Sequence, residues 1–63
     1  MTNRELTGRR VRLIWTSDRY TKLKPGDLGT AEFEDDAGTL FVRWDSGSRL
    51  GLVPNEDRWE MMD

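Results

Sequence analysis

Short runs of alternating apolar and polar residues, separated by glycine-containing turns, dominate this chain of 63 residues. A period of two gives a β-strand one apolar face, whereas an amphipathic helix needs apolar residues three and four positions apart. No segment keeps the helical spacing for three turns. The pattern therefore predicts an all-β fold.

Five runs predict five short strands, at residues 9–16, 28–34, 39–45, 49–53 and 58–62. Alternation places Trp15 inward in the first strand and Ile14 outward. Gly51, inside the fourth, is expected to mark a bend or bulge. The predicted core consists of Val11, Leu13, Ala31, Phe33, Leu40, Val42, Trp44, Leu50 and Leu52.

The connections between the strands narrow the choice of fold. A long polar loop ends in the turn Lys24–Asp27, typical of type II because Pro25 presets φ and Gly26 accepts a positive φ. Two hairpin turns follow, at residues 35–38 and 45–48, and residues 54–57 suit one 3₁₀ turn. This order predicts a five-stranded SH3-like barrel with a short 3₁₀ turn before the last strand. An OB-fold, the alternative, usually has a helix between its third and fourth strands.

The chain is short enough that residues 1–63 form one domain, with residues 1–8 as a flexible N-terminal arm. It contains no cysteine and no histidine, so thiolate ligands, thiol nucleophiles and the commonest catalytic base are missing. The acids at residues 35–36 and 56–57 are expected to be solvated. We predict no enzyme activity, no cofactor and no metal. Homo-oligomerisation stays open, because so small a core often needs further support.

No apolar run approaches the ~20 residues of a membrane span, and residues 1–5 lack the apolar segment of a signal peptide. We therefore expect a cytoplasmic protein without membrane contact. Charge is uneven: residues 1–24 hold seven basic and two acidic side chains, and residues 25–63 hold three basic and ten acidic ones. Either the two halves pair with each other, or the first half forms an electropositive face.

Two groups of residues are candidates for binding. Alternation brings Arg10 and Arg12 to the outer surface with Phe41 and Arg43, near Ile14 and Arg49. Arginine beside an aromatic ring suits either nucleic acid or a protein partner, and the alternative is a solvated face. Tyr20, in the long loop, forms a peptide slot with Trp15 or Trp59, or else folds back over the barrel.

Four motifs at residues 8–13, 23–30, 42–47 and 52–59 (GRRVRL, LKPGDLGT, VRWDSG and LVPNEDRW) cover nearly the whole chain. Together they resemble the family filed as domain of unknown function 4314, whose members are small bacterial and phage proteins. The resemblance implies a compact barrel without an assigned activity. The motifs also resemble pieces of the Mib-Herc2 and KOW types of SH3-like domain, an analogy of fold alone.

The motif residues have structural explanations. Glycines flank the entry to the second strand, the tryptophan fills the core, and the following aspartate is expected to accept hydrogen bonds from its own turn. Structural roles are thus expected for Gly26, Gly29, Trp44, Asp45, Gly47 and Pro54. We predict a non-enzymatic binding module, an adaptor or regulator that engages a protein partner. The alternative is a nucleic-acid-binding barrel that uses the basic first half; the acidic pI of about 5.0 favours the protein partner.

Overall fold

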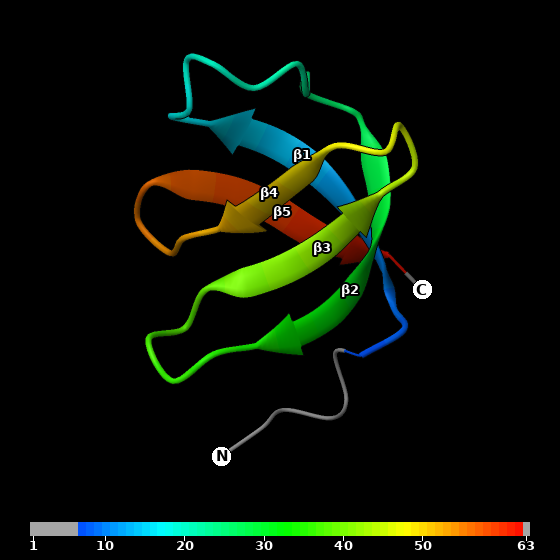
Figure 1. Cartoon of the computed structure of the whole chain (residues 1–63), viewed down its shortest axis with the longest axis vertical. Helices are drawn as coiled ribbons and strands as arrows, with labels where there is room; N and C mark the ends of the chain where they lie inside the picture. Colours follow the sequence, from blue (N-terminus) through cyan, green and yellow to red (C-terminus); the bar gives the residue numbers. More distant parts are fainter. Residues whose placement is uncertain (1–6, 63) are drawn as a thin grey trace.

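The five predicted strands form one antiparallel sheet. The computed structural model describes residues 7–62. The strands are β1 (Arg10–Thr16), β2 (Leu28–Glu34), β3 (Leu40–Trp44), β4 (Arg49–Leu52) and β5 (Asp57–Met62), in the sheet order β4-β3-β2-β1-β5 (Figure 1). The all-β prediction is confirmed. Across residues 7–62, no helix is long and apolar enough to cross a membrane.

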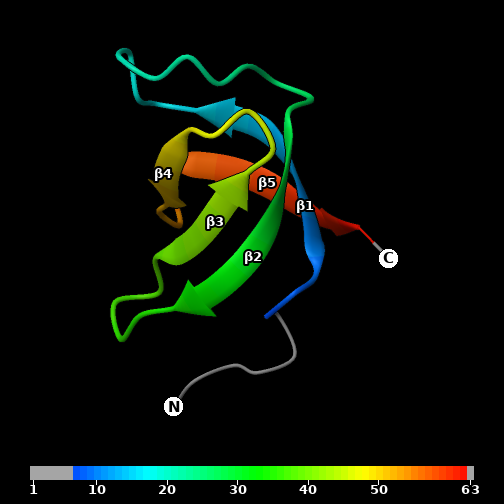
Figure 2. The ribbon, with the colours of Figure 1, turned by 45° about the vertical axis from the view of Figure 1, so that its right-hand side comes forward.

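The sheet curls so that its two edges approach each other. β1 pairs with both β2 and β5, while β4 and β5 form the edges. These two strands are in contact without being hydrogen-bonded neighbours (Figures 1 and 2). The inner side of the curl encloses the core and the outer side faces solvent.

The core contains most of the predicted residues. Trp44 is only 2% exposed, and its indole N–H donates to the backbone oxygen of Leu50 at 3.1 Å. Leu50 itself is partly buried against the core. Leu23, from the long loop before β2, is buried although alternation gives no sign of it. The buried hydrophobic residues are Val11, Leu13, Leu23, Ala31, Leu40, Val42, Trp44 and Leu52.

Two shifts in strand register make two predictions wrong. In β2, Ala31 pairs with Val42 but Phe33 pairs with Phe41, so the strand has one extra residue between them. A similar shift in β1 falls between Leu13 and Trp15. An extra residue reverses the alternation beyond it. Phe33 and Trp15, both predicted to point inward, are therefore 48% and 52% exposed.

Turns occur at the predicted positions between the strands. The Asp27 N–H donates to the Lys24 oxygen at 3.0 Å, and Gly26 has a positive φ of 97°, as predicted. Residues 54–56 form a turn in which the Glu56 N–H donates to the Val53 oxygen at 3.1 Å. Of the predicted arm, residues 1–6 lie outside the described part of the chain. Gly8 is tied to the sheet through its N–H, which donates to the Ala31 oxygen at 2.7 Å.

Candidate binding face

The register shift in β2 creates an aromatic pair on the outer side of the sheet. Because Phe33 lies opposite Phe41, their rings stack with centroids 4.6 Å apart and planes inclined by 20°. Phe33 is about half exposed and Phe41 is partly buried. Stacked rings of this kind add to the energy of simple burial. The pair is thus an ordered apolar surface that water still reaches.

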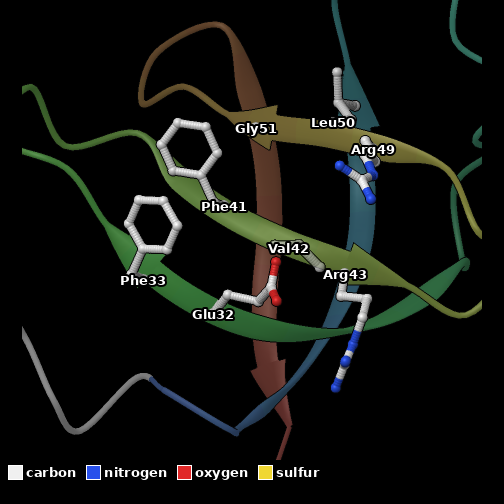
Figure 3. Close-up of a pocket in the computed structure, with 8 residues that line it drawn as sticks. All are labelled: Glu32, Phe33, Phe41, Val42, Arg43, Arg49, Leu50 and Gly51. Carbon is white, nitrogen blue, oxygen red and sulfur yellow. The ribbon is translucent and has the colours of Figure 1, made fainter.

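Gly51 leaves room beside these rings. It pairs with Phe41, and a Cβ atom at this position would lie 3.4 Å from the Phe41 ring and 2.9 Å from the Thr39 methyl group. The β3–β4 ladder has no register shift, so of the predicted bend or bulge at Gly51 the bulge is absent from this ladder. Beside the rings lies a groove of about 600 Å³ lined by Glu32, Phe33, Phe41, Val42, Arg43, Arg49, Leu50 and Gly51 (Figure 3).

Two arginines lie at the other end of this groove. Arg43 on β3 pairs directly with Arg49 on β4, and both side chains are exposed. Like charges opposite each other in a ladder repel. Among residues 7–62, no acid forms an ion pair with either guanidinium. We call the surface formed by Phe33, Phe41, Arg43 and Arg49 the aromatic–arginine face (Figure 3).

Arg10 and Arg12, which were predicted to bind together with this face, have acidic partners within the sheet. Both terminal nitrogens of Arg10 donate to the Asp45 carboxylate, one at 2.9 Å, and Arg12 forms an ion pair with Glu60. The hydrogen bond with Asp45 raises the pKa of Arg10 and lowers the pKa of Asp45 from its usual 3.8. In these two ion pairs, basic side chains of the first half of the chain bind acidic side chains of the second half. At Arg10 and Arg12 the uneven charge is therefore matched within the protein.

The aromatic residues near the long loop occupy separate places. Tyr20 is 95% exposed, whereas Trp59 is partly buried against the core. Trp15 lies opposite Arg58 on the outer side of β1 and β5. The stacked aromatic pair found in residues 7–62 is that of Phe33 and Phe41. A second, more open hollow is lined by Ile14, Asp57, Arg58, Trp59 and Glu60.

Most residues predicted to be structural have a visible role. Gly29 is buried, and a Cβ there would lie 2.5 Å from Val42 Cγ1 and 2.9 Å from the Arg43 oxygen. Gly47 has a positive φ of 91° in the β3–β4 turn. The Pro54 ring lies beside Gly38. Asp45 differs from the prediction, since its carboxylate accepts hydrogen bonds from Arg10, two strands away in the sheet.

Asp57, which was predicted to be solvated, has a structural role instead. Asp57 is only 8% exposed and accepts hydrogen bonds from the Thr16 hydroxyl at 2.7 Å, the Ser17 N–H at 3.1 Å and the Val53 N–H at 2.8 Å. Burial raises its pKa, but these bonds outweigh burial and leave the pKa below its usual 3.8. It connects the start of β5 with the end of β1.

The Asp35 carboxylate also has a structural role, because one of its oxygens accepts the N–H groups of Ala37 and Thr39, both at 2.9 Å. It therefore holds the β2–β3 turn together. In the part of the chain from 7 to 62, no three acidic side chains gather where they could hold a metal ion.

The sequence and the structure together define a small antiparallel β protein with an outward aromatic–arginine face. The family model described as "Domain of unknown function (DUF4314)" matches residues 3–62, and the chain belongs to this family. No match was found among curated proteins or among solved structures.

Proposed function

We propose that the curled sheet is an SH3-like barrel. The strand order β4-β3-β2-β1-β5 and the contact between the edge strands support this fold. The hydrogen bond from the Glu56 N–H to the Val53 oxygen, three residues back, supports a single 3₁₀ turn before β5.

We further propose that the protein is a non-enzymatic adaptor or regulatory module that binds a protein partner in the cytoplasm. One observation carries the choice of partner: the aromatic–arginine face exposes a stacked phenylalanine pair beside two arginines that lack acidic partners within the described chain. Aromatic residues and arginine are enriched at the centres of protein interfaces.

Nucleic acid is the second candidate ligand, but two ion pairs weigh against it. Phosphate binding needs positive charge that is free to replace counterions. Arg10 and Arg12, on which that alternative depended, are matched by Asp45 and Glu60. The non-enzymatic part of the proposal is supported by the structural use of Asp35, Asp45 and Asp57, each of which accepts hydrogen bonds within the protein through at least one carboxylate oxygen.

The proposal is tested by capture from a bacterial host lysate on the immobilised protein, followed by binding measurements with the purified captured protein. Phe41→Ala should weaken that binding strongly, because apolar anchors carry most interface energy. Arg12→Gln is the matched control on the same sheet and should have little effect. Thermal unfolding of both variants establishes that each is folded. Equal binding by Phe41→Ala and the wild type would refute the proposal.

The nucleic-acid alternative is tested by titrating labelled single-stranded and duplex oligonucleotides at two salt concentrations. If phosphates bind, the affinity should fall steeply with salt and should be lost in Arg12→Glu. We expect no such binding. Micromolar, salt-sensitive binding that depends on Arg12 would replace the protein partner with nucleic acid.

A further inference from the structure

The outer side of β3 presents an apolar group and a positive charge at a fixed spacing. Phe41 and Arg43 are two residues apart in a strand and line the same groove. Two residues along a strand span roughly 6.6 Å. An extended peptide has the same repeat, so its alternate side chains match these two positions. The face therefore suits an extended segment better than a helix, whose side chains recur every three to four residues.

The net positive charge of the groove favours an acidic residue in that segment. Its ionisable lining consists of Arg43 and Arg49, which pair across the β3–β4 ladder, and one acid, Glu32. In Figure 3 the two arginines lie toward one end of the face and the phenyl rings toward the other. A carboxylate placed between the guanidiniums would relieve their repulsion and accept hydrogen bonds from both. An apolar side chain two residues away would then lie on the phenyl rings.

We propose that the aromatic–arginine face binds an extended segment of the partner protein in which an acidic residue and an aromatic or large aliphatic residue are two positions apart. This inference rests on the function proposed above and specifies its ligand. The complementary charges distinguish this occupant from a second copy of the chain. Two copies packed face to face would bring four arginines together with only two copies of Glu32.

The test uses the full chain, labelled with ¹⁵N, and three blocked hexapeptides in NMR titrations. The first peptide, Ser-Glu-Thr-Phe-Thr-Ser, has the proposed spacing. The second replaces its glutamate with lysine. The third, Ser-Glu-Thr-Thr-Phe-Ser, moves the phenylalanine by one residue and so to the opposite side of an extended chain. We expect the first to bind at least about tenfold more tightly than either control, since charge and register both decide the fit.

The variants assign the effect to particular side chains. Arg43→Gln should remove most of the difference between the glutamate and lysine peptides, and Arg12→Gln, which removes a charge outside the face, should preserve it. The amide shifts should centre on Phe33, Phe41 and Arg49. Equal affinity for the three peptides, no binding of the first, or self-association through this face would overturn the inference. If the peptides fail but binding of the captured partner is still weakened by Phe41→Ala, the proposed function stands and only its ligand is wrong. If Phe41→Ala binds the captured partner as well as the wild type does, the proposed function itself is refuted.

Discussion

Arg10, at the start of β1, and Asp45, just beyond the end of β3, meet across β2 through paired hydrogen bonds between guanidinium and carboxylate. On its way the Arg10 side chain also donates to the Thr30 hydroxyl of β2 at 3.0 Å. One side chain therefore links three neighbouring strands on the outer side of the sheet. The same contact removes Arg10 from the charge available to a ligand.

The first prediction concerns this pair. Arg10 holds the pKa of Asp45 below its usual 3.8, so Arg10→Gln should raise that pKa toward the usual value. The measurement is an NMR titration of the Asp45 carboxyl carbon. Asp57 serves as the internal control, because its pKa is lowered by other groups and should stay low. An Asp45 titration that is identical in the variant and the wild type would contradict the pairing.

The second prediction concerns the buried carboxylate of Asp57. Asp57→Ala removes the acceptor of the Val53 and Ser17 N–H groups and should lower the free energy of unfolding by roughly 1–3 kcal/mol at pH 7. Urea denaturation followed by circular dichroism measures the change. An unchanged unfolding midpoint would show that this carboxylate does not stabilise the fold.

A third prediction follows from the lowered pKa of Asp57. Because its folded pKa lies below the usual 3.8, its contribution is complete above that value and is lost as the pH falls through the folded pKa. The wild type should therefore lose stability more steeply than Asp57→Asn below about pH 4. Urea midpoints measured from pH 6 to pH 2.5 provide the comparison. Parallel curves for the two proteins would be the contrary result.

The fourth prediction contrasts two aromatic residues that alternation treats alike. Trp44→Ala should cost about 3–5 kcal/mol of unfolding free energy, since it empties a site in the core. Phe33→Ala should cost much less, because Phe33 is on the outer surface. Denaturation curves of both variants decide the matter. Comparable losses would mean that Phe33 belongs to the core after all.

The fifth prediction concerns the close approach of β2 and β3 at Gly29. Gly29→Ala should destabilise the protein by about 1–3 kcal/mol, because its Cβ would collide with Val42 and with the Arg43 backbone. In Gly47→Ala the Cβ would enter open space, so the cost of that variant, roughly 1–2 kcal/mol, comes from the strain of a positive φ alone. A Gly29→Ala variant as stable as the wild type would contradict the crowding.

Alternation located all five strands and most of the core, because burial on one side of a strand imposes a period of two. It failed where an extra residue interrupts that period. The register of the β2–β3 ladder explains the position of Phe33: Glu34 pairs with Leu40 next to the turn, so Phe33 lies opposite Phe41 and on the same side of the sheet. The position of Trp15 depends on the register between β1 and β5, and no short turn sets that register because the two strands are distant in sequence.

Three of the four residues of the aromatic–arginine face were predicted to lie on the outer surface, and the fourth was missed because of the register shift in β2. Phe41, Arg43 and Arg49 were expected on the outer surface, but Phe33 was assigned to the core. The partners of Arg10 and Arg12 lie 35 and 48 residues further along the chain, at Asp45 and Glu60, and composition does not assign such pairs. Leu23 and Asp57 were missed because each gains its burial from tertiary contacts.

The aromatic–arginine face is the surface at which we propose that a protein partner binds. The most direct measurement is an amide shift map of the ¹⁵N-labelled chain with the purified captured partner. We expect shifts concentrated at Phe33, Phe41, Arg43 and Arg49 in the wild type and no such shifts in Phe41→Ala. Shifts centred instead on Arg10, Arg12 and Glu60, with the aromatic–arginine face unaffected, would contradict it.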